Sequence, residues 1–331
     1  MWLFPTNNLS QRTFLYSNRL FFRCIPGKEF ADKEITMNIA VNTDILSSTG
    51  DPEMILRLIA EAGFTHLHWC HHWASDFAYC EYEWAYYEEL FKKYNLRLLD
   101  IHGSANCEKC WWSPAEYCRK AAVLHVKNRA ETLARLGGTG ALMMHIPSLR
   151  YTFNEEQKAG VKKLFDQVRK SIDELLPDLE KLNVRLAVEN NGNDTFEHIG
   201  ILMKEYPAEY MGITYDSGHG NAETGKGLDN LEKYKDRLMA LHLNDNSSVG
   251  DPHQPPFMGT VDWERVTSII AESPYDRELS FELSMRNTPF FKEENGTEQK
   301  EEDIKKFLAD TYERCVKVQK LYDGKKKQNS K

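Results

Sequence analysis

From Met37 onward, short runs rich in apolar and β-branched residues alternate eight times with longer helical patterns. This alternation is typical of βαβ units, which build a parallel sheet. Eight such units in series predict an α/β fold, a single (β/α)8 (TIM) barrel over residues 37–322 with an extra N-terminal segment. The predicted strands are residues 37–42, 66–70, 97–101, 141–145, 185–189, 211–216, 238–243 and 278–283.

The two ends of the chain lack this alternation. Residues 1–36 show no clear period, and up to Lys28 they are basic and contain no Asp or Glu. We expect an N-terminal extension that is disordered or, if translation starts at Met37, not translated; its composition also fits an organellar transit segment. Residues 323–331 form a Lys-rich tail that is predicted to be frayed.

Composition excludes several classes of protein. Hydrophobic residues make up 41% and charged residues 28% of the 331 residues, which is ordinary for a globular protein. No run approaches the roughly 18 consecutive apolar residues that a membrane span needs. The net charge of −8 gives no support to broad electrostatic binding of nucleic acid. Seven cysteines, an odd number that includes the Cys107-x-x-Cys110 pair, predict free thiols in a reducing, cytoplasmic protein.

Histidines and carboxylates stand at the ends of six consecutive predicted strands and in the loops after them. Catalytic residues of an α/β barrel come from these carboxyl ends. Imidazole and carboxylate ligands together suit Zn, Mn, Fe or Co, and a buried group of unpaired ionisable side chains is costly without a cation. We therefore expect a divalent metal ion. The candidate ligands are His102, His145, Glu189, Asp216, His219, His242, Asp251, His253 and Glu282.

Residues 66–87 are dense in aromatic side chains. Near the mouth of a barrel such side chains can stack on sugar rings, although the same composition also fills a core or a dimer contact. His72 and Trp73 are the best candidates for substrate contact in this segment. Among the polar residues near the strand ends, we expect substrate contacts from His219, Asn190, Asp245 and Arg286.

Five motifs follow one another in the second half of the chain: AVEN (187–190), YDSGH (215–219), LHLND (241–245), GDPHQPPFMGTVDW (250–263) and SFEL (280–283). Through them, residues 37–320 resemble the xylose isomerase-like barrels, a superfamily of sugar isomerases, sugar epimerases and endonuclease IV. The resemblance implies a divalent metal (Mn, Co, Mg or Zn) held by Glu189, Asp216, His242 and Glu282. It also implies an enzyme of carbohydrate metabolism, a sugar or sugar phosphate isomerase or epimerase. Glu189 and Glu282 would then transfer a proton next to a carbonyl, through an enediolate.

Two departures and two alternatives accompany this resemblance. The ketose 3-epimerases carry a further glutamate where Thr195 stands here, and an arginine where Asp245 and Asn246 stand. The endonuclease IV branch implies three zinc ions on nine ligands, and all nine candidates occur in matching order. The alternatives are thus a multinuclear zinc phosphodiesterase and a non-catalytic sugar- or metal-binding barrel. The expected partner is a small carbohydrate, with no membrane, and a homo-oligomer is left open.

Overall fold

The structure, a computed structural model, describes residues 37–104, 109–148, 154–192, 195–222 and 227–329. Its strands form one parallel sheet in the order β7-β6-β5-β4-β3-β2-β1-β8. The strands are β1 (Ile39–Asn42), β2 (His66–Trp69), β3 (Arg97–His102), β4 (Ala141–Met144), β5 (Arg185–Glu189), β6 (Met211–Asp216), β7 (Leu238–His242) and β8 (Leu279–Phe281). The backbone N–H of Leu243 donates to Ser280 and that of Glu282 donates to Leu243, at 3.0 and 3.2 Å, which links β7 to β8. This nearly closed barrel confirms the predicted (β/α)8 fold.

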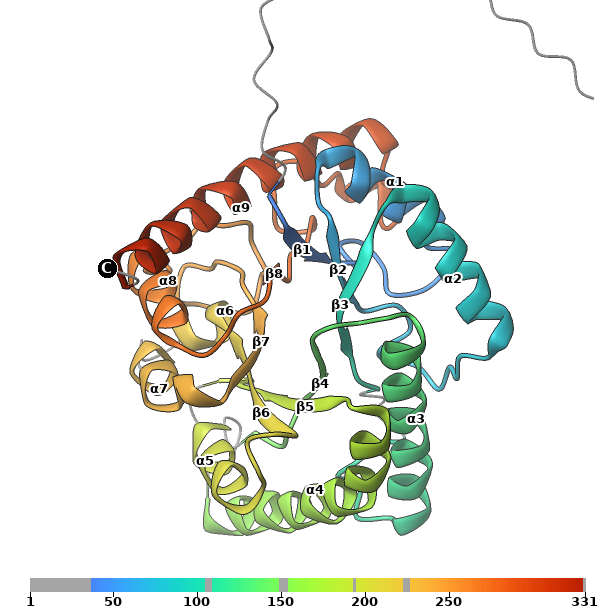
Figure 1. The fold of residues 1–331 in the computed structure, drawn as a ribbon, viewed down its shortest axis with the longest axis vertical. Helices are drawn as coiled ribbons and strands as arrows, with labels where there is room; N and C mark the ends of the chain where they lie inside the picture. Colours follow the sequence, from blue (N-terminus) through green and yellow to red (C-terminus); the bar gives the residue numbers. More distant parts are fainter. Residues whose placement is uncertain (1–36, 105–108, 149–153, 193–194, 223–226, 330–331) are drawn as a thin grey trace, which may run out of the picture. The chain divides into compact units, whose positions relative to one another are not determined.

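The helices lie outside the strands and surround them (Figure 1). They are α1 (Glu53–Ala62), α2 (Glu81–Tyr94), α3 (Glu116–Arg135), α4 (Glu155–Leu182), α5 (Thr195–Glu205), α6 (Ser217–Asn221), α7 (Gly227–Tyr234), α8 (Trp263–Glu272) and α9 (Glu301–Asn329), with the 3-10 turns η1 (Lys235–Arg237) and η2 (Glu293–Asn295). Their ends follow local chemistry. Asn154 caps α4 by accepting from the backbone N–H of Gln157 at 2.9 Å. Gly63 ends α1 in the left-handed conformation, with φ of 106°.

The Lys-rich end of the chain differs from its prediction. The sequence predicts that the last helix stops near Tyr322, but α9 continues to Asn329. Lys325 lies 2.9 Å from Glu264 of α8, and Lys326 donates to the backbone carbonyl of Tyr275 at 3.3 Å. These contacts hold the lysines of the last turns against the barrel, so the segment up to Asn329 is helical rather than frayed.

Apolar side chains fill the space between the sheet and the surrounding helices. Fully or almost fully buried examples are Leu142, Val188 and Ile213 of the strands and Phe165 and Ile199 of the helices. Small residues occupy a separate cluster that contains Ala187 and Ala240. Each stands two residues before a predicted ligand, and side chains two apart on a strand share a face. On β5 and β7 a small apolar side chain thus stands below each charged residue of the rim.

Two further expectations concern the whole chain. None of the described helices combines the length and the apolar character of a membrane span. Cys70, Cys80, Cys118 and Cys315 are free thiols in the structure. The predicted N-terminal extension of residues 1–36 and Cys107 of the Cys-x-x-Cys pair lie outside the described residues.

Candidate metal centre

Four predicted ligands meet at the carboxyl-terminal rim of the barrel. Glu189, Asp216 and His242 are the last residues of β5, β6 and β7, and Glu282 directly follows β8. Each offers one ligand atom, and these four atoms all lie within 4.8 Å of one another. All four side chains are buried. Neighbouring parallel strands end at the same rim, which is why residues far apart in the sequence converge here.

His242 lies between the two glutamates of this group. Its Nδ1 is 2.8 Å from Glu189 Oε1 and 3.0 Å from Glu282 Oε2. Burial alone would lower the pKa of His242, but the carboxylates of Glu282 and Glu189 outweigh it and raise the pKa well above its usual range. The two carboxylates thus strongly favour a positive charge between them, and they would attract a divalent cation in the same way.

Asp216 is oriented by the backbone and by two asparagines. It accepts hydrogen bonds from Asn244 Nδ2 and from the backbone N–H of His219, each at 2.7 Å. Asn190 pairs with the backbone of Asp216 in both directions, at 2.8 and 3.0 Å. Burial raises the pKa of Asp216 to about 6. Asn190 therefore holds a strand end in place, a role different from the predicted substrate contact.

A second set of predicted ligands adjoins the first. Asp251 accepts from His219 Nε2 at 3.1 Å and lies 3.0 Å from His253 Nε2. Asp216, His219 and His253 also offer ligand atoms within 4.8 Å of one another. Burial would lower the pKa of His253, but Glu282 and Asp251 outweigh it and raise the pKa to about 10. His219 of α6 and His253 of the loop after β7 thus bring two further imidazoles to the edge of the four-residue group.

His102 and His145 lie on the β3–β4 side of the group. His145 Nε2 is 2.7 Å from Glu189 Oε2, and the rings of His102 and His145 are 4.9 Å apart. The indole of Trp73 lies 4.4 Å from the His102 ring, and Asp44 holds it through a 3.0 Å hydrogen bond from Nε1. Trp73 therefore lies beside predicted ligands, as expected for a substrate contact.

His72, another predicted substrate contact, stands in a turn after β2, with a positive φ of 55°. Its ring stacks on Phe77 at 4.1 Å, and its Nδ1 lies 3.2 Å from Ser75 Oγ. None of the contacts that the described residues show for His72 reaches the four-residue group, and the substrate contacts of His72 and Trp73 stay predictions.

Asp245 and Arg286, two further predicted substrate contacts, lie in different surroundings. Asp245 is fully buried and accepts from the backbone N–H groups of Phe257 and Val261, at 2.8 and 3.0 Å, and from Trp263 Nε1, at 3.1 Å. Its carboxylate is occupied in fastening the loop after β7. Arg286 is exposed, and within the described part of the chain its side chain shows no ion pair.

We expect Asp245→Asn to lower the free energy of unfolding by about 3 kcal/mol, because an amide cannot accept from all of these buried donors. Urea unfolding followed by circular dichroism measures this. Asp229→Asn is the matched control, since Asp229 is exposed and pairs with Arg265 on the surface. Equal stability of the two variants would contradict the fastening role.

Sequence reasoning missed a layer of polar residues just below the rim. His68 Nδ1 lies 2.7 Å from Asp100 Oδ1, and both side chains are buried. Cys70, next on the same face as His68, is also fully buried. The sequence feature that marks this layer is the alternation of His66, His68 and Cys70 along β2 and the residue after it. Alternate side chains of a strand share one face, and one face of each barrel strand lines the interior.

The residues present fit a divalent cation. Among the buried polar atoms without a hydrogen-bond partner are Glu189 Oε2, His219 Nδ1 and His242 Nε2. Glu189 Oε2 does lie 2.7 Å from His145 Nε2, but without the alignment of a hydrogen bond. Buried polar atoms left unsatisfied cost free energy, and imidazole with carboxylate is a donor set typical of divalent metal sites.

Comparisons with known proteins show the family of this chain. Residues 56–310 match the family described as "Xylose isomerase-like TIM barrel". The chain belongs to this family. The resemblance inferred from the sequence motifs is thereby confirmed.

Three proteins illustrate where this xylose isomerase-like chain stands. It is 29% identical over 253 residues to the uncharacterized protein y4fM of Sinorhizobium fredii, covering 70% of this chain and 80% of that protein. Its fold is similar to that of D-psicose 3-epimerase solved in the presence of D-fructose, with a TM-score of 0.67, 12% identity and coverage of 86% and 99% of the two chains. It is also similar to that of the IOLI protein with a binding zinc atom, with a TM-score of 0.60, 15% identity and coverage of 87% and 99%. At these identities the two structures show a shared fold.

Proposed function

We propose that this protein is a divalent-metal-dependent isomerase or epimerase that transfers a proton next to the carbonyl of a sugar or sugar phosphate. The observation that carries the proposal is the convergence of Glu189 and Glu282 on one buried ligand group with Asp216 and His242. The fold that it shares with a sugar 3-epimerase supports the same reaction class.

The chain divides the chemistry among its own side chains. A bound cation would polarise the substrate carbonyl and so acidify the neighbouring C–H group. Glu189 and Glu282 are the carboxylates that can accept and return the proton, and they come from strands separated by β6 and β7. His145 Nε2 lies 2.7 Å from Glu189 Oε2 and so adjoins the proposed base. Trp73 offers an apolar surface to the C–H face of a sugar ring.

Thr195 stands where the ketose 3-epimerases carry a further glutamate, so this chain has no third carboxylate at that position. It is the first residue of α5, fully buried, and its hydroxyl donates to the backbone carbonyl of Gly192 at 2.8 Å. This hydroxyl is bonded at the start of α5, and a neutral hydroxyl is not a base that can accept a proton from carbon. Proton transfer is therefore assigned to Glu189 and Glu282 alone.

Solvent exchange tests the proposed function without knowledge of the natural product. The metal-loaded protein is incubated in deuterium oxide with ketoses and ketose phosphates, and the proton next to the carbonyl is followed by nuclear magnetic resonance. We expect deuterium incorporation with the wild type and with the control Glu197→Gln, an exposed residue of α5, and none with Glu189→Gln. Exchange by Glu189→Gln at the wild-type rate would refute the assigned base. No exchange of any substrate by the metal-loaded wild type would refute the reaction class.

A multinuclear zinc phosphodiesterase of the endonuclease IV type is the second candidate. One observation favours it: Asp216, His219 and His253 offer a second ligand group next to the first. Several cations could hold a hydroxide and neutralise a phosphate. Zinc-loaded wild-type protein would then cleave DNA at abasic sites, and His253→Ala would abolish that cleavage. Uncleaved DNA with fully loaded protein would remove this candidate.

The affinity for the cation should rise with pH. The raised pKa values of His242 and His253 mean that these imidazoles carry protons near neutrality, and a protonated imidazole cannot bind a metal. For each proton that the cation displaces, the affinity for the cation rises about tenfold per pH unit, up to the pKa of the imidazole that loses the proton. Calorimetric titration between about pH 6 and about pH 8 measures the effect. A dissociation constant that stays the same over this range would contradict it.

A further inference from the structure

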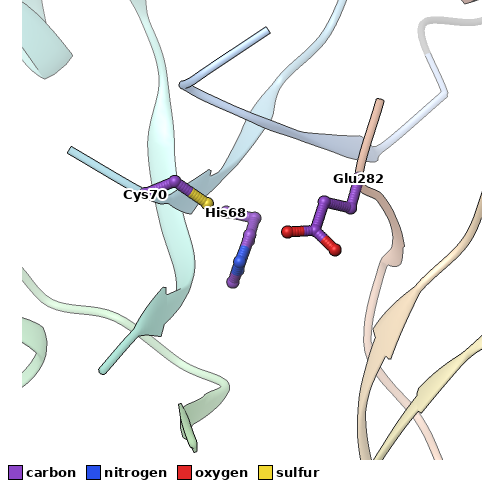
Figure 2. A group of neighbouring side chains, drawn as sticks. All are labelled: His68, Cys70 and Glu282. Carbon is purple, nitrogen blue, oxygen red and sulfur yellow. The ribbon is translucent and has the colours of Figure 1, made fainter. Parts of the chain in front are cut away.

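A group of side chains beside the four-residue centre is not explained by the proposed function. His68 lies on β2, Cys70 directly follows that strand, and Glu282 directly follows β8. Their ligand atoms lie within 4.8 Å of one another, and all three side chains are buried. Figure 2 shows the sulfur of Cys70 and the carboxylate of Glu282 pointing toward each other, with the His68 ring beside them.

His68 is held as a metal-binding histidine is held. Its Nδ1 is fixed by Asp100 at 2.7 Å, and both residues are almost completely inaccessible. Its Nε2 is buried and has no hydrogen-bond partner. A carboxylate on one nitrogen orients the ring and makes the other nitrogen a better ligand. An unsatisfied buried nitrogen costs free energy, and a cation would remove that cost.

Cys70 lies among charged groups rather than in an apolar setting. Its thiol is hydrogen-bonded to the carboxylate of Asp44, and its backbone N–H donates to Thr43 Oγ1 at 2.9 Å. Asp44 is itself held by Asn42 Nδ2 at 2.8 Å. A thiol must lose its proton to bind a metal. Burial and the carboxylates of Asp44 and Glu282 raise the pKa of Cys70 well above its usual range, so the cation has to displace that proton to the solvent when the sulfur–metal bond forms.

Glu282 can serve two cations. Its contacts with His242 and His253, at 3.0 and 3.9 Å, both use Oε2. Neither contact uses Oε1. The rings of His68 and His242 are only 4.3 Å apart, so the two ligand groups are immediate neighbours. A shared carboxylate between adjacent cations is the usual arrangement of two-metal sites.

We propose that His68, Cys70 and Glu282 bind a second divalent cation, with Glu282 bridging it to the four-residue centre. Thiolate and imidazole favour zinc or cobalt over magnesium. Three protein ligands leave one position of a tetrahedral site open for water or a substrate oxygen. This inference rests on the proposed function only through Glu282, which both sites share.

Cobalt(II) titration of the metal-stripped full-length protein tests the second site. A cobalt–thiolate bond gives a charge-transfer band in the near ultraviolet that histidine and carboxylate ligands do not give. We expect this band in the wild type and in Asp216→Asn, which damages only the first site. Cys70→Ser should lose the band and bind one equivalent of cobalt fewer. Cys118→Ser, which removes a thiol of α3, is the control and should keep both.

The outcomes separate the two proposals. A wild type that binds cobalt without the band refutes the second site and leaves the proposed function standing. A band that persists in Cys70→Ser also refutes it. If Cys70→Ser does not fold, X-ray absorption of the zinc-loaded wild type decides instead, since the site requires one sulfur at about 2.3 Å from zinc. A zinc environment of nitrogen and oxygen alone would overturn the inference.

Discussion

Glu282→Gln is expected to lower kcat/KM for the natural sugar by about a thousandfold or more. The amide keeps the size and shape of the side chain but removes its negative charge and its ability to accept a proton. It also removes one of the two carboxylates that flank His242 Nδ1, at 3.0 Å. Both the binding of the cation and the proton transfer depend on this one group, which is why the expected effect is large.

Steady-state kinetics and metal content, measured on the same preparation, check this expectation. Glu264→Gln is a suitable control, because Glu264 is exposed on α8 and pairs with Lys325 at the surface. Its turnover and metal content should equal those of the wild type. Turnover by Glu282→Gln close to that of the wild type, with the cation still bound, would contradict the proposed mechanism.

Asp216→Asn is expected to abolish the stabilisation that the first cation gives to the wild type. A cation at a hundredfold excess over its dissociation constant stabilises a protein by about 2.7 kcal/mol, which raises Tm by about 5 °C or more for a barrel of this size. Asp216 contributes a buried negative charge to the four-residue group, and its orientation is fixed by Asn244 and by the backbone of His219. An amide at this position cannot replace the charge.

Thermal unfolding of the metal-stripped proteins, with magnesium or manganese as the probe, measures this effect. These ions prefer oxygen ligands and so report on the carboxylates of the first site. Asp262→Asn is a matched control, since the Asp262 side chain caps α8 by accepting from the backbone N–H of Arg265 and is not among the candidate ligands. It is expected to show the full rise in Tm on addition of the ion. An equal rise in Asp216→Asn would show that the ion binds elsewhere.

The sequence was sufficient for the barrel and for its main ligand group. The predicted ends of strands five and six, at Glu189 and Asp216, coincide with the ends of β5 and β6. This agreement has a physical reason, because in each of these strands an apolar run is followed directly by a charged residue at the rim. The convergence of Glu282 with these residues follows from barrel closure alone, once eight parallel strands are recognised.

The remainder depended on contacts that the sequence does not display. His72 and Trp73 are both predicted as substrate contacts, but β2 ends at Trp69 and the chain turns through a left-handed residue, so strand alternation does not tell which of the two side chains faces inward. Asp245 looked like a rim carboxylate, yet it meets donors from residues 257 to 263 that only the folded loop brings close. His68 and Cys70 were overlooked although their alternation on β2 marked an inward polar face.

Elemental analysis of the protein tests the central claim most directly, namely that Glu189, Asp216, His242 and Glu282 hold a divalent cation. Wild type and Asp216→Asn are purified without added metal or chelator, and then measured again after reconstitution with manganese, cobalt, magnesium or zinc. The account predicts at least one bound ion per wild-type chain and one fewer in Asp216→Asn. A wild type that remains without metal after reconstitution, or a variant with undiminished content, would contradict it.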